Sequence, residues 1–296
     1  MSQRRKFWIF TVFIIAILVI SASYLSKVNV PVLEPKGPIA DQEFRLMVLV
    51  TGLMLIVIVP VFILLAYIIN KYKDTNQSLK RYSPDWDHNK YLEGLWWLIP
   101  TILISILSVI TWNASYALSP FKPIPSVNKT INIQVISMDW KWLFIYPQQN
   151  VASINQVVFP VNTPVHFYLT SDAPMNSFWI PQLSGQIYSM AGMQTQLNLM
   201  ANTIGSFNGW SANISGIGFA SMMFQAKSTS KTQFQTWLSK IRHNSPPLTQ
   251  VAYNQLARPS EYVPVHYYSS PKYNLFNDTI LKYMSPGASQ SMGMIQ

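Results

Sequence analysis

Two long apolar runs limit what this chain can fold into more than any other feature of its sequence. Phe44–Ile69 is an almost uninterrupted run of 26 residues, and Leu92–Leu118 is a second run of similar length. As a helix, the first run would measure about 39 Å against roughly 30 Å of hydrocarbon, so it can span a bilayer with some tilt. A content of 49% hydrophobic and 11% charged residues is also too apolar for an ordinary soluble protein. We expect a transmembrane helical hairpin within residues 40–118, rather than two core helices of a soluble protein.

The basic residues give this hairpin a direction. One group precedes the apolar stretch near the N-terminus, and the other lies between the two long runs. The residues are Arg4, Arg5, Lys6, Lys71, Lys73, Lys80, Arg81 and Lys90. Segments rich in lysine and arginine stay in the cytoplasm. Trp96 and Trp97 lie near the same end of the second run, where amphipathic rings favour the headgroup region. We therefore expect both outer ends of the hairpin, and the C-terminal part of the chain, to face outward.

Residues 1–25 permit two interpretations. The apolar run Phe7–Leu25 follows a basic start and ends near Ser21-Ala22-Ser23, small residues that suit a signal peptidase. Its length also nearly spans a bilayer. A cleaved signal peptide and a retained N-terminal membrane anchor both stay open.

The composition changes after the second long run. Pro120, Pro123 and Pro125 predict a stiff linker, and short runs rich in β-branched and aromatic residues then alternate with turn residues. Many short strands at this spacing predict an all-β sandwich or barrel over residues 119–228. The expected strands are Ile131–Met138, Trp140–Tyr146, Val157–Pro160, Val165–Ser171, Gln194–Met200 and Phe219–Ala226.

A C-terminal helical arm is expected over residues 229–296. Ser230 is a suitable N-cap, and apolar residues recur after it at helical spacing, at Phe234, Trp237, Leu238 and Ile241. This pattern predicts one amphipathic helix packed against the sandwich or a partner. The Gly-, Ser- and Met-rich end, Ser285–Gln296, is expected to be disordered.

Composition also excludes several functional classes. The chain has no cysteine, so disulfides, Fe–S clusters, zinc–thiolate sites, thiol catalysis and a lipid-modified N-terminal cysteine are excluded. The net charge of +10 could suggest nucleic acid, but the basic residues are dispersed and no binding motif is present. Ser211 and Ser215 lack a G-x-S-x-G elbow and a neighbouring histidine, which disfavours a hydrolase.

The segment Ser211–Met222 has the spacing of a dinuclear copper loop, yet lacks the residues that would bind the metal. Such a centre needs two thiolates four residues apart, with imidazole and thioether ligands, because soft sulfur selects copper. The spacing resembles subunit II of the haem-copper terminal oxidases, whose pattern is Cys-x-Glu-x-Cys-x-x-x-His-x-x-Met. The positions of that pattern are held here by Ser211, Asn213, Ser215, Phe219 and Met222. Asn176, within Met175–Trp179, stands where the family has its other histidine, so we expect no metal and no cofactor on this chain.

Loss of all ligands but one resembles the quinol-oxidising branch of this family. The bo-type ubiquinol oxidase subunit II is closely similar over Ser137–Trp142, Met175–Pro181 and Gln186–Thr195. The resemblance covers about Ile39 to Met284 and implies a cupredoxin-like Greek-key fold for the exported domain. It also implies a proton-pumping ubiquinol oxidase of the bacterial inner membrane, in which this subunit is structural and assembly-related.

The resemblance further implies the partners and cofactors. They would be oxidase subunits I, III and IV, membrane lipid, haems and copper held in subunit I, and ubiquinol as substrate of the complex. Two alternatives stay open: subunit II of an aa3-type menaquinol oxidase, which would also lack copper ligands, and a non-enzymatic membrane-anchored cupredoxin-like binding or assembly protein.

Cytochrome c is not expected as a substrate. Its electrons would normally enter through the missing copper pair. The part of the chain from Ser119 also carries ten basic and four acidic residues, a net charge of +6. A docking surface for a basic cytochrome is usually acidic, so this sign is a second argument against that partner.

The remaining candidate side chains are interpreted as structural. Without a thiolate or paired histidines, methionines more often pack in a core than bind copper; those concerned are Met190, Met193, Met222 and Met223. The histidines are far apart in sequence, at His88, His166, His243 and His266. Alternating aromatics of a half-buried strand are ordinary core or interface residues, here Trp140, Trp142 and Tyr146. A contact with the catalytic subunit through this strand is a compatible hypothesis.

Glu93 is the single candidate functional residue. The segment His88–Pro100 resembles the one that opens the second conserved span of the family, where this glutamate lies at the cytoplasmic mouth of a proton-uptake channel in subunit I. The alternative is an acid in a first helical turn, which the helix dipole favours without any function. Both interpretations stay open, and we predict no catalytic, cofactor-binding or metal-binding residue.

Overall fold

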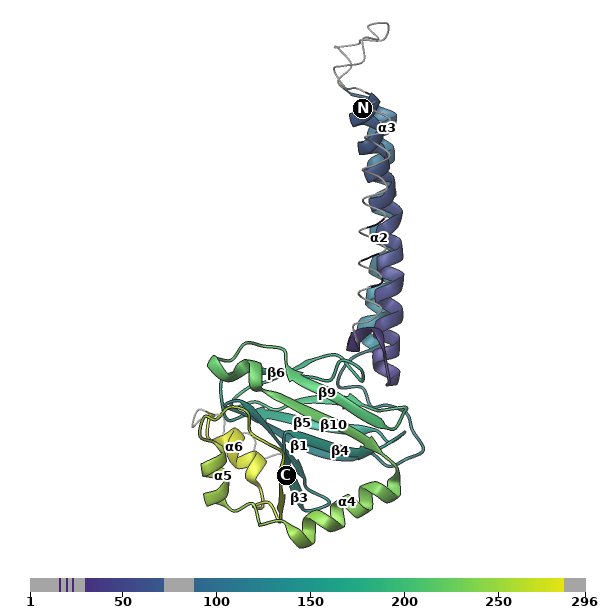
Figure 1. The fold of residues 1–296 in the computed structure, drawn as a ribbon. Helices are drawn as coiled ribbons and strands as arrows, with labels where there is room; N and C mark the ends of the chain where they lie inside the picture. The colour runs from purple at the N-terminus through teal and green to yellow at the C-terminus, as the bar shows by residue number, and fades with distance from the viewer. Residues whose placement is uncertain (1–15, 17–19, 21–22, 24–29, 72–87, 285–296) are drawn as a thin grey trace, which may run out of the picture.

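The computed structural model describes residues 16, 20, 23, 30–71 and 88–284 of the 296-residue chain. The predictions for the N-terminal segment, for most of the basic loop between the apolar runs and for the tail Ser285–Gln296 lie outside the described residues. Within the described part, a pair of long helices stands on one side of a β-sandwich, and shorter helices pack at the opposite end of that sandwich (Figure 1).

The two long helices are α2 (Pro38–Lys71) and α3 (Lys90–Ala117), and a short 3-10 helix, η1 (Pro31–Leu33), precedes them. Helix α2 begins six residues before the predicted run, because Pro38 at the first position and Asp41 in the first turn suit a helix start. In α3 the side chain of Asn89 accepts hydrogen bonds from the amides of Tyr91 and Leu92. Both helices are long and apolar enough to cross a membrane.

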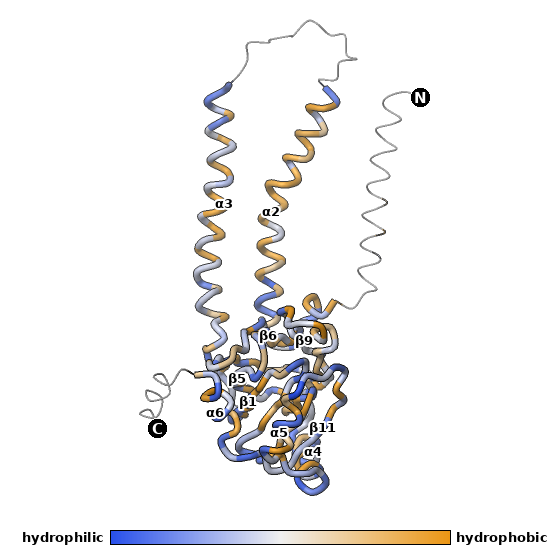
Figure 2. Tube along the Cα trace, turned by 90° about the vertical axis from the view of Figure 1, so that its left-hand side faces the viewer, coloured by the Kyte–Doolittle hydropathy of each residue, from blue (hydrophilic) through white to orange (hydrophobic). Residues whose placement is uncertain are grey.

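The hairpin does not bury its own apolar surface. None of the most apolar 18-residue window of either helix is buried. Figure 2 shows α2 coloured largely as hydrophobic and α3 in mixed colours, with the two helices standing apart over much of their length. Side chains such as Phe62 and Trp112 are each 66% exposed. Lipid or partner helices must therefore cover this surface, because an apolar area of this size is not stable in water.

Two sheets form the sandwich. Sheet A has the strand order β11-β3-β2-β1-β5-β8 and sheet B has the order β4-β10-β9-β6-β7. Strand β1 pairs in parallel with β5, and β10 with β4, while the other pairs are antiparallel. The strands are β1 (Ile131–Met138), β2 (Lys141–Tyr146), β3 (Val151–Ile154), β4 (Gln156–Pro160), β5 (Val165–Ser171), β6 (Asn176–Trp179), β7 (Ile187–Ser189), β8 (Thr195–Leu199), β9 (Gly205–Ser211), β10 (Met223–Thr229) and β11 (His266–Ser269).

Aromatic rings fill the space between the two sheets. Trp142 and Phe144 on β2 meet Phe178 on β6 and Phe224 on β10, with ring centroids 4.9 to 6.2 Å apart. These four side chains are at most 3% exposed. Such aromatic contacts add about 0.5 to 1.5 kcal/mol per pair beyond the burial of apolar area. This core fixes how β6 and β9, which carry the candidate site, lie against β2.

The sequence located six strands and overlooked β3, β6, β7, β9 and β11. Several of these are only three or four residues long, and β9 contains two glycines, so their periodicity is too weak to detect. The predicted strand Phe219–Ala226 was placed too early. Ile217–Ser221 forms a 3-10 helix, η3, and the strand begins only at Met223.

The C-terminal arm contains helices α4 (Lys231–Asn244), α5 (Gln250–Leu256) and α6 (Leu275–Leu281), together with strand β11. The predicted amphipathic helix is α4, capped by Ser230, and it buries Phe234, Leu238 and Ile241 against the sandwich. The later helices cover the outer face of sheet A, where Leu248, Tyr253 and Phe276 join a second apolar cluster with β1, β2 and β3.

This cover explains one wrong prediction. Strand β2 was expected to be half-buried, but all six of its residues are buried. The aromatic core packs on one face, and the arm packs on Leu143 and Ile145 of the other. The prediction had taken the alternating aromatic residues of β2 as its one buried face. The residues between them, Leu143 and Ile145, are apolar as well, so the other face can also be covered.

The chain before α2 is joined directly to the sandwich. The backbone amide of Lys36 donates to the carbonyl of Gln182 at 2.7 Å, and the amide of Asn202 donates to the carbonyl of Lys36 at 2.8 Å. Gly37 lies against the backbone of Leu183 and Met200. We call Lys36, Gly37, Gln182, Leu183, Met200 and Asn202 the helix seat.

Helix α3 is joined to the domain as well. The carbonyl of Pro120, three residues beyond the end of α3, accepts hydrogen bonds from the amide and the side chain of Asn198 on β8. Both long helices are therefore attached to the sandwich through short connections. These two attachments fix how the sandwich lies relative to the helical hairpin.

Candidate functional site

The ends of two strands of sheet B bring the copper-loop positions together. Ser211 is the last residue of β9, and Asn176 is the first residue of β6. The Ser211 hydroxyl lies 3.0 Å from Asn176 Oδ1 and 3.1 Å from the carbonyl of Asn213. Asn213 Nδ2 in turn donates to the carbonyl of Met175 at 2.8 Å. Three of the copper-ligand positions identified from the sequence, Ser211, Asn213 and Asn176, thus belong to one hydrogen-bonded group.

The rest of the loop packs around Trp140. Its indole Nε1 donates to the carbonyl of Ser215 at 3.0 Å, and its ring covers Gly216 and Gly218 so closely that a Cβ on either glycine would press on it. The hydroxyl of Ser215 is buried and has no hydrogen-bond partner within the described residues. The prediction that both serines hydrogen-bond within the loop is therefore confirmed for Ser211 and wrong for the side chain of Ser215.

The two apolar replacements behave differently. Met222 is 1% exposed and joins the core between the sheets, as predicted. Phe219 lies in η3 and is only half-buried, so it fills the histidine position incompletely. Its backbone amide bonds to Gly216, and the amide of Met222 bonds to Phe219, which closes η3.

These residues do not fit a dinuclear copper centre. The donors at the thiolate positions are hydroxyls, and the Ser211 hydroxyl is already engaged with Asn176 and Asn213. Copper needs soft sulfur or imidazole ligands, which these side chains do not supply. Across residues 30–71 and 88–284, no three His, Cys, Asp or Glu side chains gather in a way that could hold a metal ion.

The structure corrects one prediction about methionine. Met193 is 53% exposed and Met223 is 46% exposed, so they do not pack in the core. Met223 begins β10, where side chains alternate between the core and solvent, and it lies on the solvent side.

The histidines lie on separate elements. His166 on β5 bonds to Gln196 at 3.2 Å and stacks on Tyr168, while His243 is in α4 and His266 is in β11. Desolvation lowers the pKa of His166. Each of these three is accounted for by its own local contacts or element.

The aromatic residues of the β1–β2 region divide into two groups. Trp142 and Tyr146 are completely buried by this chain, which leaves them no surface for a partner. Trp140 lies in the turn before β2 with φ of 91° and is half-buried. A contact with the catalytic subunit through β2 itself is thus excluded, and only Trp140 keeps an exposed edge.

Glu93 lies in the first turn of α3, at the end far from the sandwich. Its backbone amide donates to the carbonyl of Asn89 at 2.9 Å, and its side chain is half-buried. Its position agrees with either interpretation from the sequence, because a first-turn acid is favoured by the helix dipole whether or not it handles protons.

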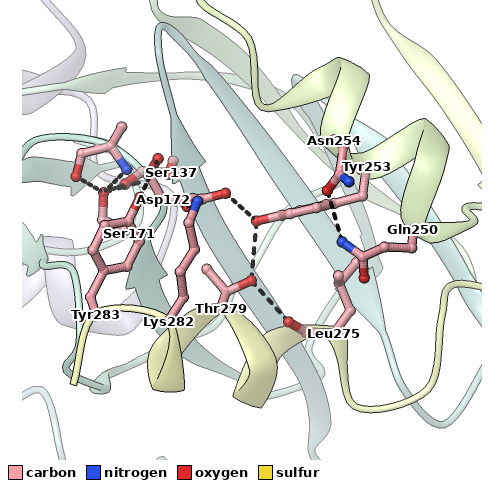
Figure 3. A network of polar contacts seen from close by, with 11 residues as sticks. Ser137, Ser171, Asp172, Gln250, Tyr253, Asn254, Leu275, Thr279, Lys282 and Tyr283 are labelled. Atoms are coloured by element: carbon pink, nitrogen blue, oxygen red, sulfur yellow. Dashed lines mark hydrogen bonds and ion pairs between the residues drawn. The ribbon is translucent and has the colours of Figure 1, made fainter. Parts of the chain in front are cut away.

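A buried carboxylate that the sequence did not reveal lies where the arm meets the sandwich (Figure 3). Asp172, just after β5, has no exposed side-chain surface and accepts from Tyr253 at 2.7 Å, Tyr283 at 2.8 Å and Lys282 at 2.7 Å. Tyr253 also contacts the hydroxyl of Thr279 at 3.1 Å. Both carboxylate oxygens have partners on the arm, so this group fastens the arm rather than awaiting a substrate.

The arm should loosen in alkaline solution. Burial raises the pKa of Tyr253 above its usual 10.0, and the bond to Asp172 raises the pKa of Lys282 above 10.5. Groups with a raised folded-state pKa stabilise fully below the unfolded value and lose this contribution as pH rises through the folded one. We expect protection of the arm from proteinase K to be constant to about pH 10 and to fall above it, measured by mass spectrometry of the fragments.

The Tyr253→Phe variant serves as the comparison for this titration. It removes one of the titrating groups, so its loss of protection above pH 10 should be less steep than in the wild type. Equal protection of the wild-type arm at pH 8 and pH 11 would contradict the expectation.

Comparison with known proteins agrees with this geometry. The family model for the periplasmic domain of cytochrome c oxidase subunit II matches residues 147–229, and the COX aromatic-rich motif matches residues 242–287. The chain is 44% identical over 266 residues to the cytochrome bo(3) ubiquinol oxidase subunit 2 of Pseudomonas aeruginosa, covering 90% of this chain and 80% of that protein. The chain belongs to the ubiquinol oxidase subunit 2 family.

Two further members extend the comparison. The ubiquinol oxidase subunit 2 of Acetobacter aceti is 41% identical over 89% of this chain and 86% of its own length. The quinol oxidase subunit 2 of Bacillus cereus is 34% identical over 88% of this chain and 89% of its own length. Within this family, the chain is a membrane-anchored protein with a cupredoxin-like outward domain, as predicted. The aromatic-rich motif coincides with the arm that Asp172 fastens.

Proposed function

We propose that this chain is the structural subunit II of a proton-pumping ubiquinol oxidase, which oxidises quinol and reduces oxygen to water. The observation that carries the proposal is the hydrogen-bonded group Ser211–Asn176–Asn213 at the copper-loop positions, in a chain 40 to 44% identical to bo-type subunits. Electrons then reach the oxidase without passing through this chain. The haems and copper belong to subunit I, and subunits III and IV complete the assembly in the bacterial inner membrane.

The fold supports an anchoring role. The exposed hairpin needs partner helices or lipid, and the helix seat and the Pro120–Asn198 bonds hold the sandwich at a fixed angle to it. Contacts in the membrane and outside it then act together through a high effective concentration. The chain can therefore hold a rigid cap on the outer face of subunit I.

Purification of the intact complex through a tag on this chain tests the proposal. We expect stoichiometric haem, oxygen consumption driven by ubiquinol, and no consumption driven by reduced cytochrome c. Copper that stays with this polypeptide after the subunits are separated, or turnover with cytochrome c at the ubiquinol rate, would refute the proposal. Rapid turnover with menaquinol, in a complex that contains haem a as its only haem, would favour the aa3-type alternative. Purification of this chain without any haem-containing subunit would favour the non-enzymatic alternative.

Glu93 is proposed to deliver protons to the channel of subunit I. A carboxylate at a channel mouth raises the local proton supply, so Glu93→Ala should slow proton-coupled turnover by about tenfold. The measurement is quinol oxidase activity together with proton uptake in proteoliposomes. Glu34→Ala is the matched control, because Glu34 is an exposed acid at the opposite end of the hairpin. If both variants turn over like the wild type, the helix-dipole interpretation of Glu93 is correct.

A further inference from the structure

The hairpin contains a groove where its two helices approach the sandwich. Its volume is about 420 Å³, and residues of both α2 and α3 line it. Most of the lining side chains are apolar, and we call the three polar ones, Gln42, Arg45 and Asn113, its rim. The lining residues are Gln42, Arg45, Leu46, Ile110, Asn113, Ala114, Ala117 and Leu118.

The groove lies at the level of the outer headgroups. Helix α2 has 34 residues and measures about 51 Å, some 20 Å more than the hydrocarbon layer. Its apolar run starts at Phe44, so Arg45 stands at the outer boundary of that layer. On α3, Asn113 lies one turn before the helix ends at Ala117. The rim is thus in the polar interface, and the apolar floor formed by Leu46 and Ile110 lies deeper.

Arg45 of the rim is paired with an acid outside the lining, Asp41, which lies one helical turn earlier on α2. Arg45 Nε donates to Asp41 Oδ2 at 3.0 Å, and both side chains are exposed, by 77% and 43%. The bond uses Nε alone, which leaves the two terminal nitrogens of the guanidinium for an anion. Arginine binds phosphate well through several parallel N–H groups. The free edge of the Asp41 carboxylate can accept from an ammonium group.

We infer that this groove binds one phospholipid with an ethanolamine headgroup. Its phosphate lies on Arg45, its ammonium on Asp41, and one acyl chain follows the floor past Leu46 and Ile110. A headgroup with a phosphate and a primary ammonium matches the Arg45–Asp41 pair. A glycerol headgroup offers no cation to Asp41, and a choline headgroup offers no N–H donor.

The occupant is a lipid because of the shape of the groove. Its lining includes the small side chains Ala114 and Ala117, and α2 and α3 stand apart over much of their length (Figure 2). An apolar slot of this size at membrane depth is filled by acyl chain rather than by water. If an apolar partner helix filled the groove instead, the terminal nitrogens of the Arg45 guanidinium would have no anion to bind.

Photocrosslinking in the intact complex tests this inference. Because the chain has no cysteine, Val109→Cys places a single thiol of this chain beside the groove, one turn from Asn113 and outside the lining, and a benzophenone is attached to it. The complex is reconstituted in vesicles with equal phosphatidylethanolamine, phosphatidylcholine and phosphatidylglycerol, illuminated and analysed by mass spectrometry. We expect adducts with phosphatidylethanolamine to exceed those with either other lipid by more than about fivefold.

Three further variants make the result specific. Arg45→Gln should lower all lipid adducts by about tenfold, since the phosphate loses its partner. Asp41→Asn should abolish the preference for ethanolamine over glycerol. Lys122→Gln is the matched control and should change nothing, because Lys122 is an exposed cation just beyond α3 and outside the groove.

Two results would overturn the inference. Adducts in proportion to the composition of the vesicles would show that the rim does not select a headgroup. Adducts with a peptide of a partner subunit in place of lipid would show that a helix fills the groove. Neither result bears on quinol oxidation, so the proposed function is tested separately.

Discussion

Replacing Gly37 with valine is expected to lower the yield of assembled oxidase by more than about tenfold. A side chain at Gly37 would overlap the carbonyl oxygen of Met200 and come within 2.9 Å of that of Leu183. Both obstacles are backbone, so neither can rotate away. The helix seat must open, which also breaks the two hydrogen bonds of Lys36. Overpacking of this kind costs about 1 to 3 kcal/mol or more.

The yield is measured by purifying the complex through a tag on this chain and determining haem per subunit. Gly52→Val in the same helix is the control, because a Cβ at Gly52 meets no atom of the described residues within 4 Å. We expect normal assembly for Gly52→Val. Normal haem content in Gly37→Val would show that the angle between helix and domain is not required for assembly.

Replacing Asp172 with alanine is expected to destabilise the C-terminal arm by about 3 kcal/mol. The carboxylate is buried and holds three donors of the arm, of which Tyr253 is the most deeply placed. After its removal, Tyr253 keeps only Thr279, and Lys282 and Tyr283 turn to solvent. The arm should then open while the aromatic core between the sheets stays folded.

Hydrogen exchange in the intact complex measures this opening. We expect protection in α5 and α6 to fall by about a hundredfold in Asp172→Ala, and protection in β1 and β2 to change little. Asp278→Ala provides the comparison. It removes the exposed ion pair with Lys272, in which both side chains are about 40% exposed, and such pairs contribute about 0 to 1 kcal/mol. Equal effects of the two variants would mean that Asp172 does not fasten the arm.

The sequence predicted the features that depend on local composition. The two long helices followed from uninterrupted apolar runs, and α4 followed from its cap and its helical spacing. The copper-loop positions were found because they follow a fixed spacing within one segment. The structure then placed Ser211, Asn213 and Asn176 together as the resemblance implied.

Features that depend on distant parts of the chain could not be predicted. Asp172 follows an ordinary strand, and its partners Tyr253, Lys282 and Tyr283 lie far along the sequence. The helix seat depends on Gly37 meeting a loop that contains Leu183, and no local pattern marks that contact. Lys141 lies in a strand as predicted, but no local pattern shows that its ammonium donates to the carbonyls of Leu256 and Arg258. Only folding reveals such contacts.

Strand β11 closes the edge of sheet A by pairing with β3, although the two are separated by most of the exported domain. Until the last part of the chain has crossed the membrane, β3 therefore presents unpaired amide and carbonyl groups. Edges of this kind recruit strands from neighbouring molecules. Translocation and folding are thus coupled. A polypeptide truncated before His266 would leave β3 as an unpaired edge strand, and we expect it to aggregate or be degraded rather than join its complex.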